Sequence, residues 1–502
     1  MKRVNALRST LLLTSASSLV LAGCALKNPP FGADIMPESA RAQIPGSWAG
    51  PHRSGTVVPN WIRTFHDSEL TALVADAIER NPDLKAAAAR VEASRAAVRI
   101  AAASLYPRIA MKGLGERQGQ HLSGDLGRNI NPPDFGSPGT ENSGGAGLDT
   151  SMDDTSRRWV YGIAAGAAWE ADVWGRIRSK KAAAKAESEA LEADYEFARQ
   201  SLAAAVARAY FTTIEAAQQE ANAQETLDIY QQYSNLTDIQ KQHGFASDFD
   251  VSQIKSRTAS AEDALYTAQQ ARAQTIRAIE IVTSHYPAGR FDVRRSFPRQ
   301  PRAVPAGLPA QLLERRPDLI ASERRFAAAF HRVNEARTAR LPRFVLSATS
   351  GLGTADLDSV GSLSALVWTF AGGVTQPIFF GGELQAAQDL RTAEQKAAAA
   401  SYVSHALHAF GDVEDALAND YYLRQREGAL GSAVSSSGES VNLAGKQLEQ
   451  GQIDMFTILR LAGENLAAKV QLTQIRASRL RERVNLYLAL GGDFDGTGAP
   501  GK

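Results

Sequence analysis

The sequence lacks a second cysteine, long apolar runs beyond its N-terminal region, and any excess of charge of one sign. Cys24 is the only cysteine in 502 residues, so the chain cannot form an internal disulfide. No later window holds eighteen consecutive apolar residues, which excludes helical membrane spans there. A net charge of +1 gives no global case for nucleic-acid binding. A membrane β-barrel stays open, because its strands are only about 10 residues long and half polar.

Catalytic motifs are missing as well. The chain has no P-loop, no Gly-x-Ser-x-Gly and no His-Glu-x-x-His motif. His405 and His408 have the spacing of one helix face and could supply half of a metal site, but no third ligand follows at a suitable spacing. A solvated helix face explains this pair better. We therefore predict no enzymatic activity, no cofactor and no bound metal.

The N-terminus has the organisation of a secretory signal. A basic start at residues 2–8 precedes a short apolar core at 11–21, and "LAGC" follows at 21–24. That tetrapeptide resembles the lipobox of bacterial lipoproteins, whose cysteine is acylated, with palmitate for example, and becomes the mature N-terminus. Ala25, where an aspartate would signal inner-membrane retention, favours the outer membrane. We predict a signal peptide over 1–23 and a lipid-anchored extension over 24–60; the alternative is a signal peptide with an incidental cysteine.

An internal repeat determines the predicted architecture. "NPDL" at 81–84 matches "RPDL" at 316–319, and the following prolines and glycines also match in pairs: Pro107 with Pro342, Gly175 with Gly382, and Gly244 with Gly451. The first half carries extra residues within 117–157, whose Gly, Asp, Asn, Ser and Pro content predicts a long exposed loop. We predict two repeats, at 61–286 and 310–491. A proline-rich linker at 287–309 joins them, and a tail follows at 492–502.

Each repeat contains two segments with the pattern of β-strands, at 107–115 and 161–171 in the first and at 342–353 and 364–378 in the second. In 161–171 the apolar residues from Tyr161 to Trp169 alternate with small or polar residues, as in a lipid-facing barrel strand. A soluble β-sandwich would give the same alternation and remains the alternative. Four strands cannot close a membrane barrel alone, because eight is the practical minimum and open edges cannot lie in lipid. Membrane strands in this chain therefore imply an oligomer.

Two very long helices are predicted, from Arg176 to about Gln242 and from Glu383 to Gln450. Proline is absent and helix-forming residues dominate, so each helix is roughly 100 Å long. Apolar residues at three- and four-residue steps indicate a coiled-coil-like bundle with a structural seam. Each helix breaks at a glycine, Gly244 or Gly451, where a left-handed residue can end it. Ser247 or Asp248, and Asp454, can then cap the returning helices.

These features resemble the outer-membrane efflux protein family of TolC-like channels, and specifically the NodT-type lipoproteins of RND multidrug efflux systems. The segment "VPAGLPAQLLERRPDLIASERRF" (304–326) carries the resemblance best, and "NPDLKAAAARVEASRA", "WEADVWGRIRSKKAAA" and the two hairpin tips agree with it. The resemblance implies an α+β membrane protein that forms a homotrimer. Three chains give four strands each to one 12-stranded β-barrel, their helices form a long periplasmic tunnel, and 287–309 with the chain ends forms an equatorial collar.

The resemblance also implies a function and its residues. The chain would be the outer-membrane exit channel of a tripartite pump, conducting drugs or other small toxic compounds passively once a periplasmic adaptor and an inner-membrane RND pump dock. The adaptor-docking positions map to the hairpin tips: Gly244, Ser247, Asp250, Gly451 and Asp454. The periplasmic gate maps to Phe456, Thr457 and Arg460. Arg460 departs from the family, which often has aspartate there, so an acidic, cation-selective gate is not expected from this position. Helix capping alone is the alternative role of the tip carboxylates.

Two other functions stay open from the sequence. One is the outer-membrane duct of an ABC-driven protein secretion system with the same fold; the lipobox and the "LLERRPDL" segment favour drug efflux over it. The other is a non-channel periplasmic coiled-coil lipoprotein with soluble strands.

Overall fold

The structure, a computed structural model, describes residues 28–119, 157–354 and 366–494. The chain contacts divide into two compact units. The described part of unit 1 consists of residues 28–30, 92–119, 157–189, 324–354 and 366–399, and the described part of unit 2 of 31–91, 190–323 and 400–494. The lipobox with Cys24, most of the predicted loop at 117–157 and the end of the tail lie outside the described residues, so they stay predictions.

The duplication is confirmed by elements of equal length in the two halves. The first helix of each repeat has 22 residues, α4 (Pro82–Ala103) and α8 (Pro317–Thr338). The long helices α5 (Arg176–Gln242) and α9 (Glu383–Glu449) have 67 residues each. The returning helices α6 (Asp248–Val282) and α10 (Met455–Ala489) have 35 each. None of the helices in the described part of the chain is long and apolar enough to cross a membrane.

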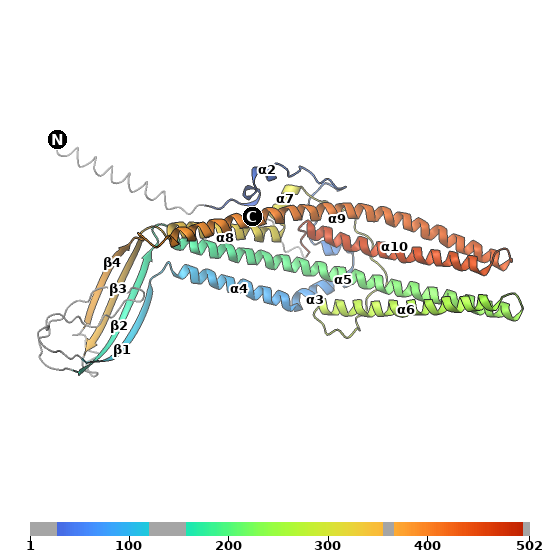
Figure 1. Ribbon diagram of the computed structural model, residues 1–502, viewed down its shortest axis with the longest axis horizontal. Helices are drawn as coiled ribbons and strands as arrows, with labels where there is room; N and C mark the ends of the chain where they lie inside the picture. Colours follow the sequence, from blue (N-terminus) through green and yellow to red (C-terminus); the bar gives the residue numbers. More distant parts are fainter. Residues whose placement is uncertain (1–27, 120–156, 355–365, 495–502) are drawn as a thin grey trace. The chain divides into compact units, whose positions relative to one another are not determined.

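The strands of both repeats form one antiparallel sheet in the order β1-β2-β3-β4 (Figure 1). They are β1 (Arg108–Gly119), β2 (Arg157–Ala171), β3 (Arg343–Thr354) and β4 (Leu366–Thr375). The four predicted strands are confirmed, with two corrections to their bounds. The predicted loop at 117–157 is too long at both ends, because cross-strand pairing continues to Gly119 and restarts at Arg157. The fourth strand stops before its predicted end at 378, since Pro377 has no N–H to donate to a ladder.

Proline and capping residues place the helix starts. Pro82 and Pro317 occupy the first turn of α4 and α8, where the missing N–H would be unpaired in any case. The Asn81 side chain accepts from the Leu84 N–H at 3.0 Å and caps α4. Both helices end before the next proline of their repeat, as the sequence predicts.

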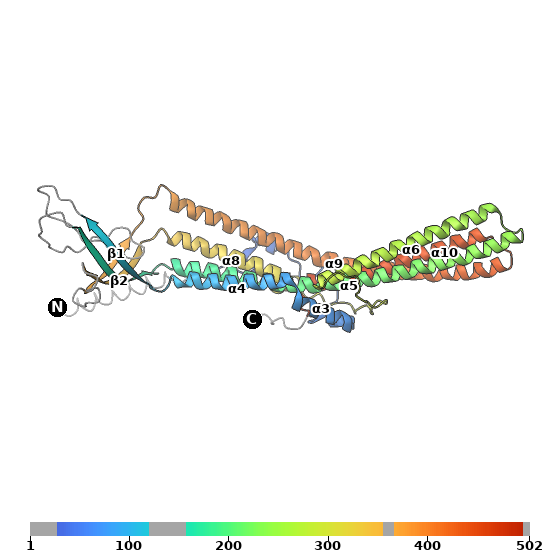
Figure 2. The ribbon, with the colours of Figure 1, turned by 90° about the horizontal axis from the view of Figure 1, so that it is seen from below.

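In unit 2 the helices pack as two antiparallel hairpins, α5 with α6 and α9 with α10 (Figures 1 and 2). The four-residue apolar steps of α5 form a buried seam: Val206, Tyr210 and Ile214 are fully buried, and Leu202 is half-buried. An aromatic cluster closes the core: Trp61 stacks on Tyr487 with ring centroids 5.5 Å apart. At about 25 cal/mol per Å² of buried apolar surface, such large side chains dominate the stability of this unit.

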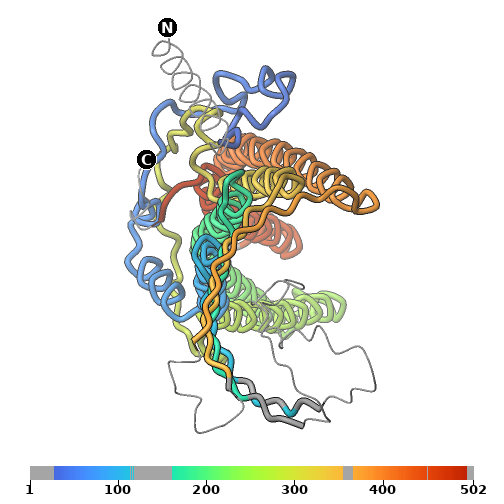
Figure 3. Tube along the Cα trace, turned by 90° about the vertical axis from the view of Figure 1, so that its left-hand side faces the viewer, coloured from blue at the N-terminus to red at the C-terminus, as the bar shows by residue number. Residues whose placement is uncertain are grey.

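Short elements surround these hairpins. They are η1 (Gly32–Ile35), α2 (Glu38–Arg41), η2 (Trp61–Phe65), α3 (Ser68–Arg80) and α7 (Pro309–Arg315). The predicted linker at 287–309 has no regular structure except for a bridge between Arg53 and Pro305 and the first residue of α7. Figure 3 shows this segment in olive-yellow running along the same side as the blue N-terminal segment.

Candidate functional site

The two hairpin tips turn with the same backbone conformation. Gly244 and Gly451 have φ values of +80° and +68°, in the left-handed region that disfavours side chains. The Gly244 N–H donates to the Lys241 carbonyl at 3.0 Å, and the Gly451 N–H donates to the Leu448 carbonyl at 3.0 Å. These bonds close the ends of α5 and α9 as in a Schellman motif. The predicted glycine breaks are therefore confirmed as backbone features.

The first tip is closed by a reciprocal capping box. The Ser247 Oγ accepts from the Asp250 N–H at 3.2 Å, and the Ser247 N–H donates to the Asp250 carboxylate at 2.8 Å. Of the two predicted caps, Ser247 is the N-cap and Asp248 is the first residue of α6. Asp248 instead pairs with Lys241 across the turn. The hydrogen bond from the Ser247 backbone lowers the pKa of Asp250, so its carboxylate stays charged and holds the turn.

The second tip has a simpler cap at the equivalent position. Asp454 is the N-cap of α10 and accepts from the Thr457 N–H at 2.7 Å. That backbone donor lowers the pKa of Asp454. All five predicted docking residues therefore lie in the two turns, and the structure gives each a backbone role. Their contact with an adaptor remains a proposal.

An aromatic contact joins the two tips. The rings of Phe249 and Phe456 lie 6.5 Å apart between centroids, and Phe249 is 69% exposed. Phe245, in the first turn, is 84% exposed. The sequence reasoning singled out Phe456 and missed Phe249. The repeat could have found it, because Phe249 and Phe456 are separated by the same 207 residues as Gly244 and Gly451.

The remaining gate positions lie on the first turns of α10. The Arg460 guanidinium donates to Glu464 at 2.7 Å, one helical turn further on, and both side chains are more than half exposed. An exposed i,i+4 pair of this kind contributes only about 0.3–0.5 kcal/mol. Arg460 therefore carries a locally compensated charge. Its role in a gate stays a prediction, as does that of Thr457.

The two histidines do not share a partner. The His405 Nδ1 lies 3.1 Å from the Ser322 Oγ, and His408 is exposed on the same helix. Within the described ranges no group of three His, Cys, Asp or Glu side chains is placed to hold a metal ion.

The sheet of unit 1 has one apolar and one polar face. Residues opposite each other in an antiparallel ladder share a face, so the register assigns each side chain. Eight large exposed apolar side chains lie on one face: Ile109, Met111, Ile163, Leu346, Leu366, Trp368, Phe370 and Val374. The other face carries Lys112, Glu170, Arg343, Thr349 and many small residues, with Val367 as the one large exposed apolar side chain among those described. β1 and β4 each leave one edge unpaired within the described chain, and all ten residues of β4 are exposed.

The two strand-to-helix junctions that follow β2 and β4 differ. After β2, Asp172 accepts from the Ile177 and Arg178 N–H groups at 3.0 and 2.9 Å and caps α5. After β4, Ile378 and Phe379 stand at the corresponding place and are 93% and 86% exposed. The first junction is therefore fixed by polar contacts, and the second presents apolar surface to its surroundings.

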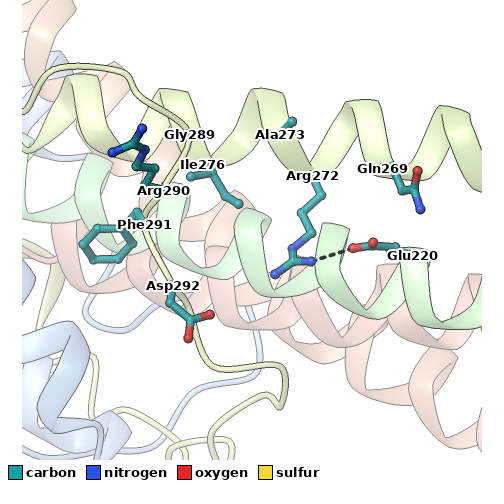
Figure 4. A pocket seen from close by; sticks show the side chains of 9 residues that line it. All are labelled: Glu220, Gln269, Arg272, Ala273, Ile276, Gly289, Arg290, Phe291 and Asp292. Carbon is teal, nitrogen blue, oxygen red and sulfur yellow. Dashed lines mark hydrogen bonds and ion pairs between the residues drawn. The ribbon is translucent and has the colours of Figure 1, made fainter.

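A shallow hollow of about 380 Å³ lies in unit 2, between α5, α6 and the start of the linker (Figure 4). An ion pair between Glu220 and Arg272 at 2.8 Å crosses it. The second repeat has the same pair, Glu427 with Arg479. The hollow mixes both charges with one aromatic ring, Phe291, and its contacts do not define a catalytic centre.

Comparisons with solved structures define the class of fold. The chain superposes on the outer-membrane channel OprN with a TM-score of 0.80 at 25% identity, covering 94% of this chain and 99% of that one. It superposes on the Campylobacter jejuni CmeC outer membrane channel with a TM-score of 0.80 at 22% identity, covering 95% and 94%. The fold is thus the duplicated α+β fold of TolC-like outer-membrane channels.

Sequence comparison then gives the family. The outer membrane efflux protein model matches residues 73–283 and 308–492, and the chain belongs to this family. The probable efflux pump outer membrane protein SepC of Pseudomonas putida is 30% identical over 491 residues, covering 96% of this chain and 97% of that protein. The outer membrane protein OprJ of Pseudomonas aeruginosa is 29% identical over 475 residues, covering 91% and 92%. The predicted resemblance to the outer-membrane efflux protein family is confirmed.

Proposed function

We propose that this protein is the outer-membrane exit channel of a tripartite RND-type efflux pump. The amphipathic sheet with two unpaired edges is the observation that carries the proposal. An open edge cannot lie in hydrocarbon, because its N–H and C=O groups would have no partners there. The β1 edge of one chain and the β4 edge of the next can pair, and three chains then close a 12-stranded barrel with the apolar face toward lipid.

The polar face of the sheet suits the inside of such a barrel. Lys112, Glu170 and Thr349 share that face with glycines and alanines, whose small size leaves room for water. In the trimer the long helices continue the duct into the periplasm. The protein makes and breaks no bonds in this function; it conducts, and the inner-membrane pump supplies the energy.

The cargo is proposed from the relatives. Proteins of P. putida that resemble this chain are named for the efflux of toluene, solvents and antibiotics. Small toxic compounds are therefore the proposed cargo, and substrate choice belongs to the pump. Deleting the gene should increase susceptibility to such compounds and leave protein secretion unchanged. Loss of a secreted protein with unchanged susceptibility would instead indicate the ABC-driven secretion duct.

The hairpin tips are proposed to dock the adaptor through Gly244, Ser247, Asp250, Gly451 and Asp454. Gly451→Val puts a β-branched side chain at a φ of +68°, which costs at least 1–2 kcal/mol and displaces the turn. Resistance should be lost while the trimer still reaches the outer membrane. Gly428→Val is the matched control, because Gly428 lies inside α9 with open space around it. Full resistance in Gly451→Val cells would remove the docking role.

Lipid anchoring at Cys24 completes the proposal. An acyl chain would hold each chain to the inner leaflet of the outer membrane through the extension at 24–60. Mass spectrometry of the mature protein should find an acylated N-terminal Cys24. A free thiol at Cys24, or an intact Met1, would contradict this part.

A further inference from the structure

The linker at 287–309 concentrates positive charge. It contains five arginines and a single aspartate, whereas the whole chain has a net charge of +1. The rest of the chain therefore sums to a slightly negative charge, whereas the linker is strongly positive. Five prolines in the same stretch disfavour helix and sheet.

Four of the five arginines are exposed and form no ion pair within the described part of the chain. Arg294 pairs with the buried Asp67 at 3.1 Å. The others have no ion-pair partner within the part of the chain that the structure describes, and we call them the basic belt: Arg290, Arg295, Arg299 and Arg302. Their four guanidinium groups make the belt a positively charged surface.

The backbone beneath the belt is fixed to the helices of unit 2. The Gln218 side chain of α5 donates to the Arg295 carbonyl at 3.2 Å. The buried Arg483 of α10 donates to the Arg302 carbonyl at 3.0 Å. These contacts use main-chain atoms of the belt, so its side chains stay available. A fixed backbone lowers the entropy that a partner must remove on binding.

The start of the belt is fixed in the same way. The Glu280 carboxylate accepts from three consecutive backbone N–H groups at residues 289–291, at 2.7, 2.9 and 3.2 Å. In Figure 4 the Arg290 side chain points away from the Glu220–Arg272 pair. Arg272 therefore has an acidic partner in the hollow, and Arg290 does not.

The belt lacks the apolar centre of a protein-docking surface. Three apolar side chains of the linker turn inward: Val293 and Val304 are each 4% exposed, and Ala306 is 2% exposed. Leu308 is 53% exposed, but it lies at the end of the linker, beyond the last arginine of the belt. Protein interfaces depend on buried aromatic and apolar anchors, whereas charge alone suits a polyanion. The observations thus favour a polymer that carries repeated negative charges.

We propose that the basic belt binds the carboxylates of the cell-wall peptidoglycan. The proposal rests on the proposed function, which places the helices of unit 2 in the periplasm, where that polymer surrounds them. Guanidinium groups match carboxylates in bidentate geometry. Each exposed pair is weak, but three chains present the belt three times to one polymer, which raises the effective affinity.

Co-sedimentation of the purified full-length protein with peptidoglycan sacculi tests the belt. The triple variant Arg295→Gln, Arg299→Gln, Arg302→Gln removes three charges and leaves the main-chain contacts in place. Its dissociation constant should rise about tenfold. The matched control removes three exposed charges elsewhere in the chain, through Arg257→Gln, Arg426→Gln and Lys396→Gln. This control should change the dissociation constant less than about twofold. Binding should also fall with added salt, and sacculi whose carboxylates are amidated should bind weakly.

Equal binding by the belt variant and the wild type, or equal binding to amidated sacculi, would overturn the proposal. A belt variant that binds sacculi normally but no longer associates with the adaptor would also overturn the proposal, and it would identify the belt as a protein interface. Conductance and susceptibility separate the two proposals. A protein that conducts but does not bind sacculi refutes only the peptidoglycan proposal. A protein that binds sacculi but does not conduct refutes only the channel proposal.

Discussion

The three matched helices of the two repeats have identical lengths, but several of the side-chain contacts that hold them differ. At the base of the second hairpin, Arg483 pairs with Asp420 at 2.6 Å, and both are buried. The matching positions of the first repeat hold Ile276 and Thr213, also buried. Glycine, proline and helix-forming residues thus keep the repeated backbone. Some contacts around it are also kept, such as the Glu220–Arg272 pair and its counterpart Glu427–Arg479, while others have diverged.

The same divergence appears at both ends of the long helices. Asp172 caps α5, while Phe379 stands exposed at the matching position before α9. At the tips, Ser247 and Asp250 form a capping box where the second repeat has only Asp454 as an acceptor. Functional differences between the halves are therefore expected at these three places, and each can be tested by exchanging residues between repeats.

The largest effect is expected at the buried ion pair. Arg483→Ile leaves the Asp420 carboxylate buried without its main partner, which should cost about 3–5 kcal/mol. Asp420→Thr should cost a similar amount by leaving Arg483 unpaired. The double variant recreates the pair of the first repeat and should recover much of the loss. Thermal unfolding followed by circular dichroism checks this, and additive losses would show that the repeats are not exchangeable here.

A smaller effect is expected at the strand-to-helix junctions. Asp172→Ala removes two cap hydrogen bonds from α5 and should cost about 0.5–2 kcal/mol. Phe379→Ala should cost less, because its side chain is 86% exposed. Amide hydrogen exchange in the first turns of α5 and α9 measures the loss of local stability in each variant. Equal deprotection of the two turns would contradict the contrast between the junctions.

The aromatic contact between the tips should couple the two repeats weakly. Phe249→Ala and Phe456→Ala together should cost less than the sum of the single variants by about 0.5 kcal/mol, the lower end for aromatic pairs. A double-mutant cycle on thermal stability gives the value. A coupling of zero would mean that the rings are neighbours without an energetic link.

The smallest effect is expected from acid at the tips. The pKa values of Asp250 and Asp454 are lowered in the folded chain, so their stabilisation is present above the unfolded pKa, about 3.9, and is lost as pH falls through the lower folded value. Protection factors of the tip amides should therefore fall only at strongly acidic pH. The second tip should lose more, because Ser247 still accepts from the Asp250 N–H when the carboxylate is protonated. Equal loss at both tips would contradict this ranking.

The sequence predicts the repeated backbone well because local signals encode it. Helix-forming composition sets α5 and α9, and Gly244 and Gly451 set their ends. Strand bounds are less predictable: β1 continues to Gly119 only because the second strand pairs with it there. Backbone pairing across the sheet leaves no local mark in the residues.

Contacts between distant residues are the part that sequence reasoning misses. The buried Asp67 caps α3, accepts from the Tyr210 hydroxyl at 3.1 Å and pairs with Arg294. These partners are far apart along the chain, so no local sequence motif predicts their contacts. Phe249 is the exception, since the repeat spacing points to it.

Conductance of the purified, detergent-extracted protein in planar bilayers, with its mass measured in the same preparation, tests directly whether three chains form one channel. We expect trimers that open stable aqueous pores. A stable monomer that enters bilayers without conducting, or that stays in water, would contradict it.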